Sequence, residues 1–287
     1  MHATSLEQAI TWQNATDYGL TAGLHSLDPR EVDLWIDRVQ AGNLYVNRGI
    51  TGAIVQRQPF GGWKRSSVGA SAKAGGPNFL AHLGTWSRRP LRRAADPSCL
   101  SAPVKRLVDQ AAAHLSEADQ AHLLAAATSD EVAWNREFGI AKDVSQLGVE
   151  RNVFRYRPAA VTIRADGAPL LDVLRVVAAG LRSGAMLELS SATQLPAFDG
   201  IAVRVEERAQ WLKRMADERP ARVRVVGRGA SELAAALGGD PDVAVHAGPV
   251  TWAGRVELLP FLLEQSVSIT NHRFGNHDAS FDGVLAH

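Results

Sequence analysis

Apolar residues at helical spacing predict two helices in the first fifty residues. Ser5 and Gln8 form a capping box that opens the first helix. Asp28 is the expected N-cap of the second helix, and Pro29 follows at the first helical position. The apolar face of this second helix consists of Val32, Trp35, Ile36 and Val39. We expect the helix to end at Gly42.

Strand-like runs accompany these helices and become regular later in the chain. We predict short strands at Leu20–Leu24 and Asn43–Asn47, and helical structure from Val104 to Phe138. From "AVTIRA" onward, β-prone runs alternate with helical runs, with "ELLPFLLEQ" in the place of a helix before the strand "VSITNH". Such alternation is typical of a parallel sheet covered by helices. The sequence therefore predicts an α/β fold.

The composition changes near Thr85. The stretch "TWSRRPLRRAADPSCLSAP" is basic, contains proline and has no periodicity, so we interpret it as a linker. It divides the chain into a first domain over 1–86, a linker over 87–102 and a second domain over 103–287. The basic run is most simply a solvated surface, because no aromatic side chains interleave with it as nucleic-acid binding would require.

The overall composition is that of an ordinary globular protein. Hydrophobic residues make up 46% and charged residues 21% of the 287 positions, which is enough for a real core. With 31 Lys and Arg against 30 Asp and Glu, no net field favours nucleic acid or an anionic membrane. No apolar run approaches the roughly 20 residues that span a bilayer, and the N-terminus lacks a signal-peptide pattern. We therefore expect a cytoplasmic protein.

Several small motifs have a chemical interpretation and a simpler one. Gly227-Arg228-Gly229 follows a strand and precedes a helix, which is the place of a phosphate-binding loop. Glu232 stands where that motif needs a third glycine, so a plain strand-to-helix turn is the better interpretation. "NHRFGNH" contains His272 and His277 with Asp278 beside them, but the spacing fits no metal site and favours a polar surface turn.

The candidate nucleophiles are equally weak. Cys99 lies in the linker and is most simply an incidental thiol. Because it is the single cysteine, the chain cannot form an internal disulfide. Lys64 with Ser66 and Ser67 matches no serine–lysine motif, so a serine-rich loop is favoured.

The stretch "ITGAIVQRQPFGGWKRSS", residues 50–67, is the most informative. Its glycines allow the backbone to approach a ligand closely, and the peptide N–H groups around Gly52 and Ala53 could receive a carboxylate. Phe60 is an aromatic residue on a constrained Pro-Phe-Gly turn. From these residues alone, a ligand site and a glycine-rich connection with Phe60 as a core plug are equally good interpretations.

A longer run of motifs resembles a known family. "GNLYVNRGITGAIVQRQPFGGWKRSSVGASAKAGGPNFLAHL", with the preceding "LEQAITWQNATDYGLTAGLHSLD", resembles the end of the aldehyde dehydrogenase catalytic domain. Within that family it is most similar to the L-glutamate γ-semialdehyde (1-pyrroline-5-carboxylate) dehydrogenase branch. "ERNVFRYRP" and "AGPVTWAGRVELLPFLLEQSVSITNHRFGN" resemble the C-terminal extension of long bacterial proline-utilisation proteins. That extension implies a non-catalytic, Rossmann-like parallel-sheet domain.

The resemblance implies a reaction and roles for three residues. The family oxidises L-glutamate γ-semialdehyde to L-glutamate with NAD, the second step of proline degradation. A cysteine attacks the aldehyde, hydride passes to NAD, and a glutamate activates the water that releases the acid. By the same resemblance, the backbone of Gly52 and Ala53 anchors the substrate's α-carboxylate, and Phe60 lies against its aliphatic chain.

This sequence also departs from the family pattern. The family's nucleophile, catalytic glutamate, oxyanion-hole asparagine and most of the NAD pocket precede the matched region, and Cys99 follows it. We therefore expect the 287 residues to be a fragment of a longer enzyme, without dehydrogenase activity of their own. Ser67 stands where many aldehyde dehydrogenases have glycine, which would alter the turn slightly.

Two other functions remain as alternatives. The extension after Pro103 suggests a non-catalytic capping or assembly subunit for a separate dehydrogenase chain, or a part of an oligomer. A nucleotide-binding module at Gly227–Gly229 is the weaker alternative. In a fragment, Trp35, Leu44, Val46 and Phe60 would lose neighbours that bury them, so we expect them to be more exposed than in the longer enzyme and the isolated chain to aggregate.

Overall fold

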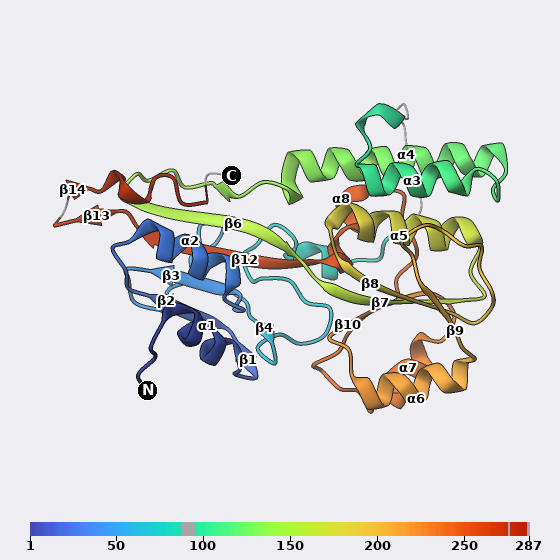
Figure 1. The fold of residues 1–287 in the computed structure, drawn as a ribbon, viewed down its shortest axis with the longest axis horizontal. Helices are drawn as coiled ribbons and strands as arrows, with labels where there is room; N and C mark the ends of the chain where they lie inside the picture. The colour runs from blue at the N-terminus through green and yellow to red at the C-terminus, as the bar shows by residue number, and fades with distance from the viewer. Residues whose placement is uncertain (88–95, 275, 286–287) are drawn as a thin grey trace. The chain divides into compact units, whose positions relative to one another are not determined.

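A computed structural model describes residues 1–87, 96–274 and 276–285, which form two compact units (Figure 1). The first unit consists of Met1–Gly84, Gly139–Arg157 and Leu263–His287, and the second of Thr85–Phe138 and Pro158–Leu262. This division differs from the consecutive domains expected from the sequence, because two late segments belong with the N-terminal one. The basic run of the predicted linker, residues 88–93, lies outside the described residues.

The first unit is built on a five-stranded mixed sheet. In spatial order its strands are β2 (Thr21–Leu24), β3 (Asn43–Val46), β12 (Leu262–Thr270), β6 (Glu150–Pro158) and β5 (Lys142–Asp143). The helices are α1 (Leu6–Asn14) and α2 (Pro29–Arg38), with 3-10 turns at Phe79–His82 and Ala279–Phe281. Two further pairs are β1 (Tyr18–Gly19) with β4 (Trp63–Lys64), and β13 (His272–Arg273) with β14 (Asn276–His277). The predicted strands at the N-terminus are confirmed.

The helix starts follow their sequence signals, whereas one predicted end is wrong. Ser5 accepts a hydrogen bond from the Gln8 amide, and Asp28 accepts one from the Arg30 amide. Helix α2 ends at Arg38 rather than at Gly42. Gly42 is needed for close packing instead, because a Cβ there would lie 2.0 Å from the Gly61 carbonyl oxygen.

The core of the first unit joins residues from both ends of the sequence. Trp35, Leu44 and Val46 are buried together with Val267 and Ile269 of β12. Strand β12 pairs in parallel with β3, with Val267 opposite Leu44. The expected exposure of Trp35, Leu44 and Val46 is therefore wrong, because the C-terminal strand supplies the apolar neighbours that cover them.

The second unit is a parallel sheet between two helical layers. Its strand order is β11 (Ala244–His246), β10 (Arg222–Gly227), β7 (Ala160–Asp166), β8 (Met186–Ser191) and β9 (Val203–Val205). Figure 1 shows α5 (Leu170–Ser183) with α3 (Ala102–Ala111) and α4 (Glu117–Ala133) on one face, and α6 (Arg208–Glu218) with α7 (Ala230–Ala236) on the other. The chain continues from α4 into a π-helix at Trp134–Phe138, and a 3-10 turn precedes α3 at Pro97–Cys99. The predicted strand–helix alternation is confirmed.

One predicted helix of the alternation is replaced by a 3-10 turn and the start of a strand. In "ELLPFLLEQ", helix α8 (Gly254–Glu257) gives way to a 3-10 turn at Leu259–Phe261, and β12 begins at Leu262. The apolar run is compatible with either structure, and Pro260 cannot continue a helix interior.

Candidate functional site

The Phe60 turn is held by hydrogen bonds at every backbone polar group from Pro59 O to Gly61 O. Phe60 exchanges backbone hydrogen bonds of 3.0 and 2.9 Å with Ala74. Asn43 Nδ2 donates to the Pro59 carbonyl at 3.1 Å, and Asn43 Oδ1 accepts from the Gly61 amide at 3.2 Å. Lys73 Nζ donates to the Gly61 carbonyl at 2.5 Å. The turn is therefore rigidly placed, with the Phe60 side chain half-buried.

The Gly52–Ala53 segment is held by a side-chain hydrogen bond to one carbonyl, while both of its residues are exposed. Tyr45, which is buried, donates its hydroxyl to the Gly52 carbonyl at 2.7 Å. Gly52 has a φ of +132°, a conformation that favours glycine. Both residues are exposed, and neither the Gly52 nor the Ala53 amide donates a hydrogen bond within the described chain. Two exposed, unused N–H groups in sequence are a suitable receptor for a carboxylate.

The two parts of the predicted site are tied to one neighbouring segment. The Gln56 amide, just after Ala53, donates to the Gly75 carbonyl at 3.0 Å, and Phe60 is bonded to Ala74. Ala74 and Gly75 therefore bond both the Phe60 turn and the loop three residues after Ala53. The structure brings all three residues expected from the sequence into one loop assembly.

Residues from the C-terminal strands brace this assembly, and sequence reasoning missed them. Glu264 of β12 accepts from the Lys73 amide at 2.6 Å and from Asn78 Nδ2, while its carbonyl accepts from Trp63 Nε1 at 2.7 Å. Ser266 Oγ donates to the Pro59 carbonyl at 2.7 Å.

Strand β6 braces the other part of the assembly. Gln58 Nε2 donates to Asn152 Oδ1 at 2.9 Å and to Glu150 Oε1 at 3.2 Å. Arg48 forms an ion pair with Glu150, and burial of the Gln58 and Asn152 side chains protects these contacts from water. Contacts between residues more than 90 positions apart leave no local sequence signal.

The other candidate residues near the loop have structural partners. Lys64 Nζ donates to the carbonyls of Asn14 and Thr16, while Ser66 Oγ accepts from the Gly19 amide. Ser67 Oγ lies 2.8 Å from Ser71 Oγ, and the residue does not have a positive φ, so serine fits this turn. These contacts give no serine–lysine pair and favour the loop interpretation.

Cys99 and the histidine turn show no catalytic or metal-binding arrangement in the described part of the chain. Cys99 is exposed overall, but the neighbouring protein partly desolvates its thiol, and this desolvation together with the carboxylates of Asp96 and Glu131 raises the thiol pKa. A raised pKa disfavours the reactive thiolate. His272 pairs with His277 across a two-stranded turn, and His277 Nε2 lies 3.1 Å from Asp282. Among the residues described, no group of three or more potential metal ligands occurs.

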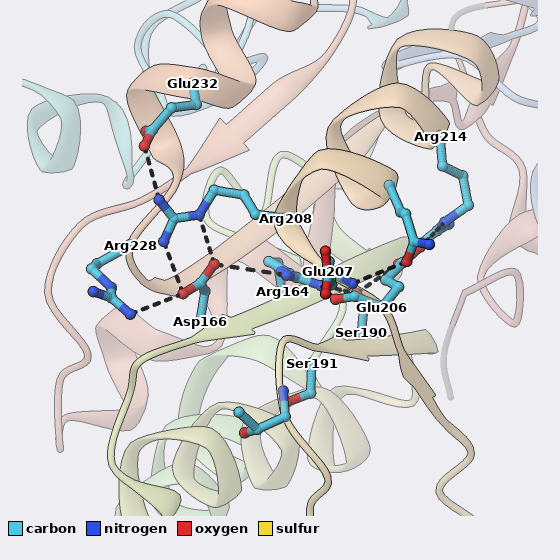
Figure 2. A network of polar contacts seen from close by, with 12 residues as sticks. Arg164, Asp166, Ser190, Ser191, Glu206, Glu207, Arg208, Arg214, Arg228 and Glu232 are labelled. Carbon is cyan, nitrogen blue, oxygen red and sulfur yellow. Dashed lines mark hydrogen bonds and ion pairs between the residues drawn. The ribbon is translucent and has the colours of Figure 1, made fainter.

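The Gly227–Gly229 turn is the second candidate site and is filled by the protein's own groups (Figure 2). The Arg228 amide donates to the Asp166 carbonyl at 2.9 Å, and a Cβ at Gly227 would lie 2.2 Å from that oxygen. Asp166 is nearly fully buried beneath a bidentate contact from Arg208, with distances of 2.8 and 3.0 Å. The hydrogen bonds from Arg208 lower the pKa of Asp166 and keep it ionised.

This arrangement does not fit a dinucleotide. The amide that would receive a pyrophosphate oxygen is already bonded, and the buried carboxylate would repel the phosphate charge. Glu232 and Glu206 add further negative charge to the network, each paired with an arginine. The tight strand-to-helix turn predicted from the sequence is the structure observed.

Comparison with known proteins shows what the N-terminal part is similar to. Residues 1–85 match the model of the "Aldehyde dehydrogenase family". This segment is therefore similar to the aldehyde dehydrogenase family, and the resemblance inferred from its motifs is confirmed. In the part of the chain that the structure describes, no helix is long and apolar enough to cross a membrane.

Two curated proteins are similar to this segment. The segment is 46% identical over 85 residues to the bifunctional protein PutA of Rhizobium meliloti, covering 30% of this chain and 7% of that protein. It is 44% identical over 79 residues to the 1-pyrroline-5-carboxylate dehydrogenase of Bacillus cytotoxicus, covering 28% of this chain and 15% of that enzyme.

A solved structure covers nearly the whole chain. Proline Utilization A (PutA) from Corynebacterium freiburgense is 43% identical and superimposes with a TM-score of 0.75 over 96% of this chain and 25% of its own. The likeness therefore extends through the second unit and confirms the α/β fold class. The chain spans a quarter or less of the length of each of these three relatives.

Proposed function

We propose that this chain supplies the substrate-anchoring part of an L-glutamate γ-semialdehyde dehydrogenase that acts in proline degradation. The observation that carries the proposal is the pair of exposed, unused amides at Gly52 and Ala53 beside the braced Phe60 turn. The names of the Rhizobium and Bacillus relatives support the same substrate class.

In this proposal each of the three residues performs one binding task. The amides of Gly52 and Ala53 donate hydrogen bonds to the α-carboxylate, and charge-assisted bonds of this kind are short and strong. The half-buried Phe60 ring packs against the aliphatic chain and thereby directs the far end of the substrate. A fixed backbone and a fixed ring discriminate substrates by length as well as by charge.

The chemical step requires groups that these residues do not provide. NAD, when bound, accepts the hydride as the aldehyde is oxidised to the acid. Within the described chain, the Gly227–Gly229 turn does not fit NAD, and Cys99 has a raised thiol pKa in a different unit from the loop. We therefore infer that the 287 residues alone do not catalyse the oxidation, and that the nucleophile and the NAD pocket come from residues outside them.

Binding of L-glutamate, the reaction product, tests the proposed anchor. Ala53→Pro removes one amide donor, and Val55→Pro is the matched control in the same exposed loop, where the Val55 amide makes no hydrogen bond within the described chain. We expect Ala53→Pro to weaken L-glutamate binding about 10–100-fold in calorimetry, as loss of one charged hydrogen bond predicts. Equal affinities of the two variants would contradict the proposal.

A second function, a non-catalytic assembly subunit, is favoured by one observation. The first unit exposes many large apolar side chains, among them Ile54, Val55, Val68, Phe79, Leu80 and Leu83. Leu80 is 75% exposed, and in this alternative a partner protein covers it together with its neighbours Phe79 and Leu83. Its partner in this case would be a separate dehydrogenase chain.

Co-purification distinguishes the two functions. An assembly subunit should bind a separately produced 1-pyrroline-5-carboxylate dehydrogenase, and the double variant Leu80→Glu/Leu83→Glu should abolish that binding. A chain that remains monomeric and recovers no dehydrogenase would argue against the assembly function while leaving the anchor intact.

A further inference from the structure

We propose that Lys73 is a positioning residue that fixes the Phe60 turn through its ammonium group. The inference rests on the proposed function, because Phe60 is there the contact for the substrate's aliphatic chain. Lys73 itself touches no substrate in this proposal. It acts through the backbone of the turn and through Asn43.

The Lys73 ammonium is buried at the centre of the turn's hydrogen bonds. The residue is 3% exposed, and its Nζ donates to Asn43 Oδ1 at 2.7 Å and to the Gly61 carbonyl at 2.5 Å. Asn43 Oδ1 also accepts from the Gly61 amide, and Asn43 Nδ2 donates to the Pro59 carbonyl. The Lys73 ammonium thus holds the Gly61 carbonyl directly. It also orients the side-chain amide of Asn43, which bonds Pro59 and Gly61 on either side of Phe60.

Removing the ammonium would leave one acceptor without a partner and weaken the hold on a second. The Gly61 carbonyl would lose its bond to Lys73, and Asn43, which is 1% exposed, would lose the charge that fixes its amide orientation. An unsatisfied buried polar group is costly, so the turn would open until water could donate a hydrogen bond to the Gly61 carbonyl. Opening the turn moves Phe60, because its own amide and carbonyl bond only Ala74, next to Lys73.

The environment of Lys73 also sets its protonation. Burial lowers the pKa of Lys73 to about 7, and the Glu264 carboxylate of β12 opposes this shift. Glu264 accepts from the Lys73 backbone amide, and Asn78 joins its carboxylate to the hydroxyl of Tyr156 on β6. Hydrogen bonds from the charged ammonium are stronger than those from the neutral amine, so the turn is held most firmly below the pKa.

Hydrogen exchange of the whole chain tests the proposal without any ligand. Lys73→Met removes the ammonium and keeps the length of the side chain. Lys64→Met is the matched control, because Lys64 also donates to two backbone carbonyls, those of Asn14 and Thr16, away from the turn. At pH 6, we expect the amides of residues 60 and 61 to exchange about tenfold faster in Lys73→Met, the effect of one lost charged hydrogen bond.

The control and the pH dependence make the result decisive. Lys64→Met should leave exchange at residues 60 and 61 unchanged. In the unaltered protein, protection of these amides, corrected for intrinsic exchange, should fall several-fold between pH 6 and pH 9 relative to β3. This second measurement also decides the matter if Lys73→Met does not fold.

Three results would overturn the proposal. They are unchanged protection at residues 60 and 61 in Lys73→Met, equal loss of protection over the whole first unit, and a protection ratio that does not vary with pH. None of them depends on glutamate binding. Failure of the glutamate experiment with an intact Lys73 effect would reject the proposed function and keep the positioning role.

Discussion

Strand β12 should determine the stability of the N-terminal strand β3, although more than 200 residues separate them in the sequence. Ile269 of β12 lies opposite Val46 in parallel register and is fully buried in the core that contains Trp35 and Leu44. Ile269→Ala removes three carbon atoms from this core. At about 0.8 kcal/mol for each buried methylene, the transfer loss is about 2 kcal/mol, and the cavity raises the total to about 2–5 kcal/mol.

The assay is hydrogen exchange of β3 amides at increasing urea concentration, which reports the free energy of opening that strand. Val144→Ala is the matched control, since Val144 is a half-exposed valine of the same unit. We expect Ile269→Ala to reduce the opening free energy of β3 by about 2–5 kcal/mol, and Val144→Ala by less than about 0.5 kcal/mol. If β3 kept its protection in Ile269→Ala, the two strands would not form one cooperative core.

Three further predictions concern buried contacts. Arg175→Met should destabilise the second unit by about 3–5 kcal/mol in urea unfolding, because it leaves the fully buried Asp130 without its ion-pair partner. Arg175 binds Asp130 at 2.7 and 2.8 Å. A cost under about 1 kcal/mol would refute this prediction. Burial, against the attraction of Arg175, raises the pKa of Asp130 to about 6, so the folded state binds a proton more readily and stability should fall by up to about 3 kcal/mol as pH rises from 4 to 7. Asp130→Asn should lack this dependence, and an unchanged profile would be contrary evidence. Gly42→Ala should cost about 1–3 kcal/mol in the first unit, because its Cβ would meet the Gly61 carbonyl oxygen, and a neutral effect would show that the loop yields freely.

Local signals in the sequence were sufficient for the helix starts and the alternation of the second unit. Ser5 and Asp28 cap the helices they were expected to cap, since capping depends on neighbours within four residues. The helix expected in "ELLPFLLEQ" fails because a continuous apolar run suits a buried strand equally well. Only the partner strand decides between them, and β3 is far away in the sequence.

The residues of the candidate site also differ in whether the sequence could indicate them. Gly52, Ala53 and Phe60 could be proposed as site residues because their motif is contiguous and matches a family. Lys73 and Glu264 could not, because their roles come from pairings between distant segments. One available signal was the single lysine among small residues in "GASAKAGGPN", where a charge has no evident exposed face. The burial of Trp35 was missed for the same reason, since the covering strand follows it by more than 200 residues.

The amide chemical shifts of Gly52 and Ala53 during titration with L-glutamate test the central claim most directly. We expect both amide protons to shift downfield in a saturable manner, while L-glutamate α-amide, which lacks the α-carboxylate, produces no such shift. The same titration in Ala53→Pro should show weaker binding at Gly52. Shifts that are absent for both ligands, or equal for both, would contradict the assignment of this loop as the carboxylate anchor of a glutamate semialdehyde dehydrogenase.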